Sequence, residues 1–131
     1  MKIITDLTPR NNDKNIDVFA IPQATFAMRV NEPIVIPEDD GDHTYKIILE
    51  KMTIVDESGK EIVGNIEYTS SRDGANFIST DILPPNKTLK AIAQVSFMEK
   101  KEGIYETIML DGKKATETEE RVFSTGTAPS S

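Results

Sequence analysis

The chain has 131 residues, 37 % of them hydrophobic and 28 % charged, which suits one folded domain with a modest core. Its 22 acidic and 15 basic side chains give a net charge of -7 without a basic cluster along the sequence, so we expect no nucleic acid as a partner. The lack of cysteine excludes disulfides, thiol catalysis and thiolate zinc sites. The apolar runs are too short for a membrane-spanning helix, so no membrane insertion is expected.

Alternation of apolar and polar residues predicts strands along most of the chain. The first candidate is IDVFAI (16–21), and a second runs over 24–30. The second candidate has four apolar residues on one face: Ala24, Phe26, Met28 and Val30. We therefore expect the first quarter of the chain to form short strands that pack one face against a core.

The segment YKIILEKMTIV (45–55) changes the phase of its alternation partway along. Its apolar residues stand at odd positions as far as Leu49 and at even positions from Met52 onward. A single extra residue in one strand of a pair produces such a change. The sequence therefore predicts a β-bulge or a short break near Glu50.

The clearest alternation lies in TLKAIAQVSFM (88–98), where Val95 and Phe97 are predicted to face the core and Lys90 and Gln94 the solvent. Phe26 and Phe123 are predicted core residues for the same reason. Only ATETEER (115–121) has a helix-like composition, but it is rich in threonine and lacks an apolar stripe. The shorter candidate strands are EIVGNIEY (61–68), ANFIST (75–80), YETIML (105–110) and RVFST (121–125).

Turn residues separate these strands. DESGKE (56–61), SSRDG (70–74) and LDGKK (110–114) each contain a Ser-Gly or Asp-Gly pair that is typical of hairpins. The two prolines of LPPN (83–86) fix a rigid loop, and 99–104 is predicted to be a loop as well. Many short strands at close spacing predict an antiparallel sandwich or barrel.

Several of these segments, taken in order, resemble the bacterial immunoglobulin-like domains of the S-layer type. Residues 4–34 resemble the family's opening strands, and MTIVDESGKEIVGNIEY (52–68) resembles its hairpin with Asp-x-x-Gly. Residues 77–97 resemble its Leu-x-Pro-x-Thr-x-Tyr segment, with Leu89 where a tyrosine is usual, and RVFSTG (121–126) resembles its final strand. The matching positions are Pro9, Asn12, Ile16, Val18, Phe26, Pro33, Leu83, Pro85, Thr88 and Leu89.

The resemblance implies an immunoglobulin-like antiparallel β-sandwich of about seven strands over residues 1–126, and 127–131 has the composition of a linker or tail. It also implies a non-catalytic module of a larger exported or surface-associated bacterial protein, periplasmic or at the cell surface. Such a module serves as a spacer, an adhesion domain or a protein-interaction domain. Its expected partners are other domains of the parent protein, or surface proteins and glycans. The opening residues carry no export signal, because Asp6 interrupts the apolar run.

Catalysis is not expected. The single histidine, His43, lies in the acidic run PEDDGDHT and is predicted to be a surface residue. The sequence has no glycine-rich phosphate-binding motif, and its serines lie in predicted turns and in the tail. We therefore expect no enzyme activity and no cofactor.

An alternative function is calcium or glycan binding by the acidic loop 37–44. Calcium takes about 6–8 oxygen ligands, and this loop is dense in carboxylates, although its spacing does not match an EF-hand. Asp73 or Asp81 would have to complete the set of calcium ligands. The competing interpretation is a solvated acidic loop without metal. Tyr68 and Tyr105 are the candidate glycan contacts, and packing in the core or at its rim is the favoured interpretation of both. The candidate metal ligands are Glu38, Asp39, Asp40 and Asp42.

Overall fold

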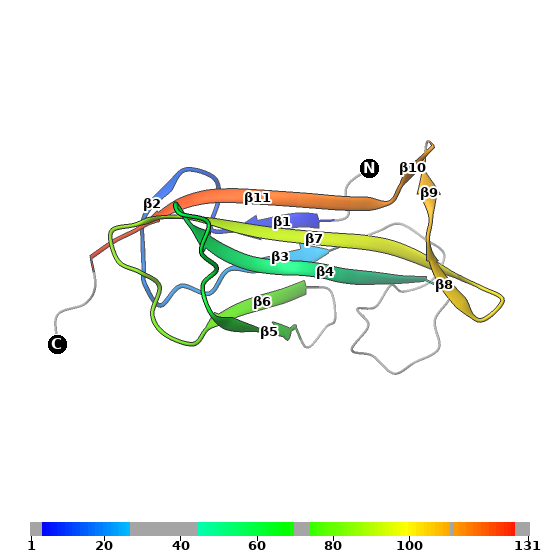
Figure 1. The fold of residues 1–131 in the computed structure, drawn as a ribbon, viewed down its shortest axis with the longest axis horizontal. Coiled ribbons are helices and arrows are strands. Elements are labelled where there is room, and N and C mark those ends of the chain that lie inside the picture. The colour runs from blue at the N-terminus through cyan, green and yellow to red at the C-terminus, as the bar shows by residue number, and fades with distance from the viewer. Residues whose placement is uncertain (1–3, 27–44, 70–73, 111, 128–131) are drawn as a thin grey trace.

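The computed structural model describes residues 4–26, 45–69, 74–110 and 112–127. These residues form strands and turns and contain no helix. Figure 1 shows the longest strands running along the longest axis of the molecule. Their bounds are β1 Ile4–Thr8, β2 Asp13–Ile16, β3 Gln23–Phe26, β4 Tyr45–Asp56, β5 Gly64–Tyr68, β6 Gly74–Ser79, β7 Thr88–Lys101, β8 Ile104–Thr107, β9 Met109–Leu110, β10 Lys113–Lys114 and β11 Thr116–Thr125.

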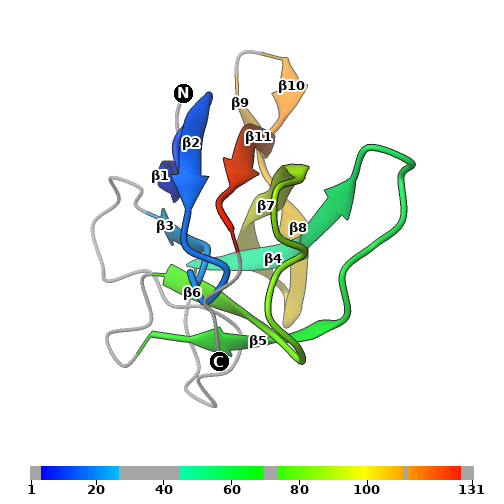
Figure 2. The same ribbon diagram turned by 90° about the vertical axis from the view of Figure 1, so that its left-hand side faces the viewer.

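Two sheets pack face to face as a β-sandwich (Figure 2). One sheet has the strand order β1-β3-β6-β5, and the other has β2-β11-β7-β4 with β8 added beside β7. The immunoglobulin fold has the same order, with its first, second, fifth and fourth strands in one sheet and its third, sixth and seventh in the other. The pairing of β2 with β11 is parallel, and the other pairings are antiparallel. The predicted immunoglobulin-like sandwich is confirmed, and β8, β9 and β10 are additions within the connection from β7 to β11.

The core lies between the sheets and is built by the alternation that the sequence predicts. Val95 and Phe97 of β7 are 0 % and 1 % exposed, and Phe26 and Phe123 are buried as well. Burying a phenylalanine or valine side chain stabilises a fold by about 1.5–3 kcal/mol, so these few positions hold the two sheets together. The other predicted inward residues of β7 are buried too: Leu89, Ala91 and Ala93.

The predicted irregularity of β4 is confirmed. The pairing of β4 with β7 shifts between Leu49 and Lys51, so Glu50 is an extra residue in β4. Ile47 before the shift and Ile54 after it are both buried in the core, although seven positions separate them. A bulge allows this because it reverses the phase of alternation once.

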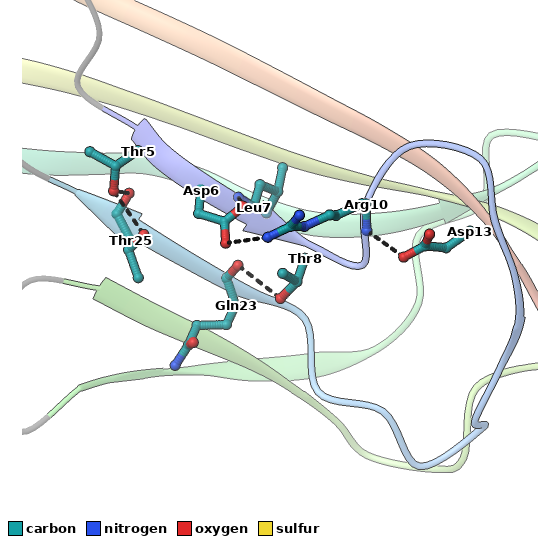
Figure 3. Close-up of polar contacts among 8 residues, drawn as sticks. All are labelled: Thr5, Asp6, Leu7, Thr8, Arg10, Asp13, Gln23 and Thr25. Carbon is teal, nitrogen blue, oxygen red and sulfur yellow. Dashed lines mark hydrogen bonds and ion pairs between the residues drawn. The ribbon is translucent and has the colours of Figure 1, made fainter.

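The side of the sandwich near the N-terminus is closed by the chain crossing from one sheet to the other. β1 lies beside β3, where the Thr5 hydroxyl lies 2.8 Å from the Thr25 hydroxyl, and the Thr8 hydroxyl donates to the carbonyl of Gln23 at 3.4 Å (Figure 3). The amide of Ile4 donates to the Glu117 carboxylate of β11 at 3.1 Å. This bond joins an edge amide of one sheet to a strand of the other.

The strand predicted over 16–21 is wrong beyond its first residue. β2 ends at Ile16, and the next residues form a turn in which the Asp17 side chain accepts a hydrogen bond from the Phe19 amide at 2.8 Å. An aspartate that bonds the backbone two residues later favours a turn over a strand. Phe19 and Ile21 are consequently 62 % and 54 % exposed.

The connection between β7 and β11 also differs from its prediction. Segment 99–104 is no open loop, because β7 continues to Lys101 and a tight turn at Glu102 and Gly103, with φ of 52° and 81°, leads directly into β8. Such positive angles at both central residues are those of a two-residue hairpin. The strand predicted over 105–110 is split at Ile108 into β8 and β9. Segment 115–121 belongs to β11 from Thr116 onward, as its threonines favour.

Candidate interaction surface

The predicted metal ligands Glu38, Asp39, Asp40 and Asp42, together with His43, lie outside the described residues. Within the described part of the chain, no three metal-binding side chains gather into a group. No helix among those residues is long and apolar enough to cross a membrane. The calcium site therefore stays a prediction from sequence.

The two candidate glycan contacts have different surroundings. Tyr68 of β5 is half-buried and packs against the core. Tyr105 of β8 lies under two lysines, with the Nζ of Lys46 at 4.6 Å and that of Lys100 at 6.0 Å from the ring centre. Cations at this range are attracted by the face of the ring. The face of Tyr105 is thus already occupied by lysines, which disfavours it as a surface on which a sugar stacks.

The hairpins between β7 and β11 project beyond the first sheet (Figure 1). We call residues 98–110 and 112–114 the arm. Its base is fixed by three backbone bonds of normal length. The amide of Phe97 donates to Ala115 at 2.9 Å, the amide of Ile108 donates to Phe97 at 3.1 Å, and the amide of Ala115 donates to Ile108 at 2.9 Å. The arm is therefore a braced extension of the sheet.

Two apolar side chains stand on this arm in contact with solvent. Ile104, directly after the β7–β8 turn, is 65 % exposed, and Met109 of β9 is 59 % exposed. Because these large apolar side chains stay exposed, the fold does not gain the free energy that their burial would supply. The sequence contained this signal, because Ile104 follows the Glu102-Gly103 turn directly, but interpreting 99–104 as a loop concealed it.

The outward surface of the five-stranded sheet is the second feature that the sequence did not reveal. Register fixes which residues lie side by side there: Lys51, Gln94 and Thr118 form one row, and Thr53, Ile92 and Glu120 the next. We call this surface the lysine face. Its residues are Lys46, Ile48, Lys51 and Val55 of β4; Lys90, Ile92, Gln94, Met98 and Lys100 of β7; Tyr105 and Thr107 of β8; and Thr116, Thr118, Glu120 and Val122 of β11. Thr53 and Ser96 point to the same side of the sheet but are buried, at 9 % and 3 % exposed.

Two lysines of the lysine face lie near carboxylates. Lys90 lies 3.9 Å from Glu120, and Lys51 lies 4.0 Å from Glu61, with all four side chains 42 % exposed or more. Exposed ion pairs at such distances contribute little to stability. Both pairs therefore leave their charged groups in contact with solvent.

Asp56, where β4 ends, has a clear local role. Its carboxylate accepts hydrogen bonds from the Ser58 hydroxyl at 2.6 Å, the Lys60 amide at 3.0 Å and the Ser58 amide at 2.9 Å. These donors hold the pKa of Asp56 below its usual value, with the Ser58 hydroxyl as the largest cause. The carboxylate closes the β4–β5 turn that the Ser-Gly pair predicted.

Comparison with known proteins finds no family model and no curated protein that matches this chain. Among solved structures, the crystal structure of L,D-transpeptidase 3 from Mycobacterium tuberculosis in complex with a faropenem-derived adduct is similar, with a TM-score of 0.44 and 10 % identity. The match covers 87 % of this chain and 54 % of that one, so the chain spans about half of its length. A likeness at this level carries no argument about function, which depends here on the surfaces described above.

Proposed function

We propose that this chain is a non-catalytic immunoglobulin-like module of a larger exported or surface-associated bacterial protein, and that it serves in protein interaction. The placement in an exported protein rests on the resemblance to S-layer-type domains. The interaction role rests on one observation, which is the arm with Ile104 and Met109 exposed on braced hairpins.

The arm has the properties of a contact surface. Its backbone is fixed before any partner arrives, so that little conformational entropy is lost on binding. Ile104 and Met109 offer apolar area that a partner would remove from water, and methionine adapts its shape to a partner's surface. Immunoglobulin-like sandwiches carry loops at their ends in the same way, and variable domains use the corresponding connection for binding.

A photo-crosslinking experiment tests the arm in the cells that make this protein. A benzophenone amino acid replaces Ile104 or Met109 in separate variants, and adducts formed on irradiation are identified by mass spectrometry. The matched control places the same amino acid at Ile82, which is 42 % exposed and precedes β7 rather than lying on the arm. We expect one protein adduct shared by both arm positions and missing from the control.

Competition makes the result specific. Excess purified domain should suppress the adduct, and the same domain carrying Ile104→Ser with Met109→Ser should not. If neither arm position gives an adduct, or if the control position gives the same one, the arm is not the contact surface.

A further inference from the structure

We infer that the lysine face docks against an acidic surface of a partner protein. This inference goes beyond the proposed role of Ile104 and Met109, because it concerns the outward face of the five-stranded sheet, which extends onto the arm, and specifies the chemistry of what binds there. It rests on charge, on the apolar residues between the charges, and on the contrast with the opposite sheet.

The charge of the lysine face is opposite to that of the whole chain. Four lysines lie on this surface, Lys46, Lys51, Lys90 and Lys100, against two carboxylates, Glu120 of β11 and Glu61, which lies 4.0 Å from Lys51. The chain as a whole carries a net charge of -7. Because these lysines are dispersed along two strands, no basic cluster exists in the sequence, and only the pairing of β4 with β7 brings them together. Complementary charge steers a partner to such a patch and fixes its orientation.

Apolar side chains between the lysines favour a protein over a polyanionic glycan or a nucleic acid. Ile48, Ile92 and Met98 are half-buried members of this surface. Sulfates or phosphates would pair with the ammonium groups but leave these side chains in contact with water. Tyr105, already covered by lysines, offers no stacking platform of the kind that single-stranded nucleic acids use. A protein surface that mixes carboxylates with apolar residues satisfies both components.

The opposite sheet has no such character. The outward side of β1 and β3 presents Thr5, Thr8, Gln23 and Thr25, whose hydroxyl and carbonyl groups bond one another (Figure 3). Lysines are missing from the described residues of that sheet. Two copies of the lysine face would repel each other, so a symmetric pairing of this face with itself is disfavoured.

The size of the lysine face suits a specific contact. From Lys90 to Lys100 the surface runs about 33 Å along β7, and three strands make it about 15 Å wide. The flat area of this surface is about 500 Å². Its accessible area is larger, because side chains stand out from the sheet, and it approaches the roughly 800 Å² that each partner buries in a standard interface. A face of this size holds a partner without contacts from Ile104 or Met109.

Titration with defined peptides tests the inference on the intact chain. The probes are poly-L-glutamate, a peptide alternating Glu and Val, and heparin, each added to the ¹⁵N-labelled protein at about 20 mM salt and at about 150 mM salt. We expect both acidic peptides to shift amide signals of β4, β7 and β11, with weaker binding at the higher salt. The Glu–Val peptide should bind more tightly than poly-L-glutamate, and Ile92→Ser should remove that advantage.

Charge reversal with a matched control localises the binding. Lys51→Glu with Lys90→Glu should weaken peptide binding by about tenfold or more. Lys113→Glu with Lys114→Glu, on β10 outside the lysine face, makes the same change in net charge and should alter binding less than about threefold. Lys51→Gln with Lys90→Gln should weaken peptide binding by an intermediate amount. This neutral variant replaces the charge-reversal variant in the test if the latter does not fold.

Four results would overturn the inference: no binding of the acidic peptides, equal losses in the two charge-reversal variants, signals that shift elsewhere on the molecule, or heparin bound more tightly than the Glu–Val peptide. The last would replace the protein with a polyanionic glycan as the occupant. None of these measurements involves Ile104 or Met109. The peptides can therefore fail to bind the lysine face while crosslinking from the arm succeeds, and crosslinking can fail while the peptides bind.

Discussion

Replacing Phe97 with alanine tests the arrangement of the two sheets at its centre. The Phe97 ring is 1 % exposed and stacks on Tyr45, with 5.5 Å between ring centres and 13° between ring planes. Returning a phenylalanine side chain to water costs about 2.5 kcal/mol. A residual cavity of about 80 Å³ adds about 2 kcal/mol. We expect Phe97→Ala to lower the free energy of unfolding by about 3–5 kcal/mol, including the lost stack on Tyr45.

Urea denaturation measures this loss, and Gln94→Ala is its control. Gln94 lies on the same strand but points outward, so its replacement should change the free energy of unfolding by less than about 0.5 kcal/mol. With a slope of about 2 kcal/mol per molar urea, Phe97→Ala should lower the unfolding midpoint by about 2 M. Similar midpoints for the two variants, or a loss below about 1 kcal/mol for Phe97→Ala, would show that β7 does not present these faces.

Three further predictions concern turns, close packing and calcium. Gly64→Ala should destabilise the fold by about 1–3 kcal/mol in thermal melts, because the added Cβ would lie 2.5 Å from the Ile78 carbonyl oxygen, whereas Asn65→Ala should be near neutral. Asp56 contributes stability above its unfolded pKa of 3.8, and this is lost as pH falls through its lower folded pKa. Asp56→Asn should therefore lower stability at pH 7 and flatten its dependence below about pH 4, and a profile unchanged from wild type would contradict this. Millimolar calcium should raise the melting temperature no more than sodium chloride of equal ionic strength. A larger rise that Asp40→Asn with Asp42→Asn removes would establish the metal site.

The parts of the fold that sequence predicted are those fixed by alternation alone. Leu89 to Phe97 are buried at every second position, and the phase change near Glu50 marked the bulge before any pairing was known. These patterns are legible because a strand with one buried face must repeat every two residues. The class of fold follows from them.

The errors arose where a local side-chain bond or a backbone angle outweighed hydrophobicity. IDVFAI has the composition of a strand, but the Asp17 carboxylate bonds the Phe19 amide and turns the chain. Glu102 adopts a positive φ, which no periodicity reveals, and so a hairpin was interpreted as a loop. The lysine face was inaccessible for another reason, since it depends on which strands are neighbours and in what register.

The bulge in β4 connects the fold to the inferred binding surface. Lys46 and Lys51 are five positions apart, so in a regular strand their side chains would point to opposite faces, and one of them would point into the core. The extra residue at Glu50 reverses the alternation between them, which places Lys46 beside Met98 and Lys51 beside Gln94 on the same outward surface. The same reversal keeps Ile47 and Ile54 buried. A regular strand would likewise point Ile47 and Ile54 to opposite faces, so one inserted residue serves the core and the lysine face together.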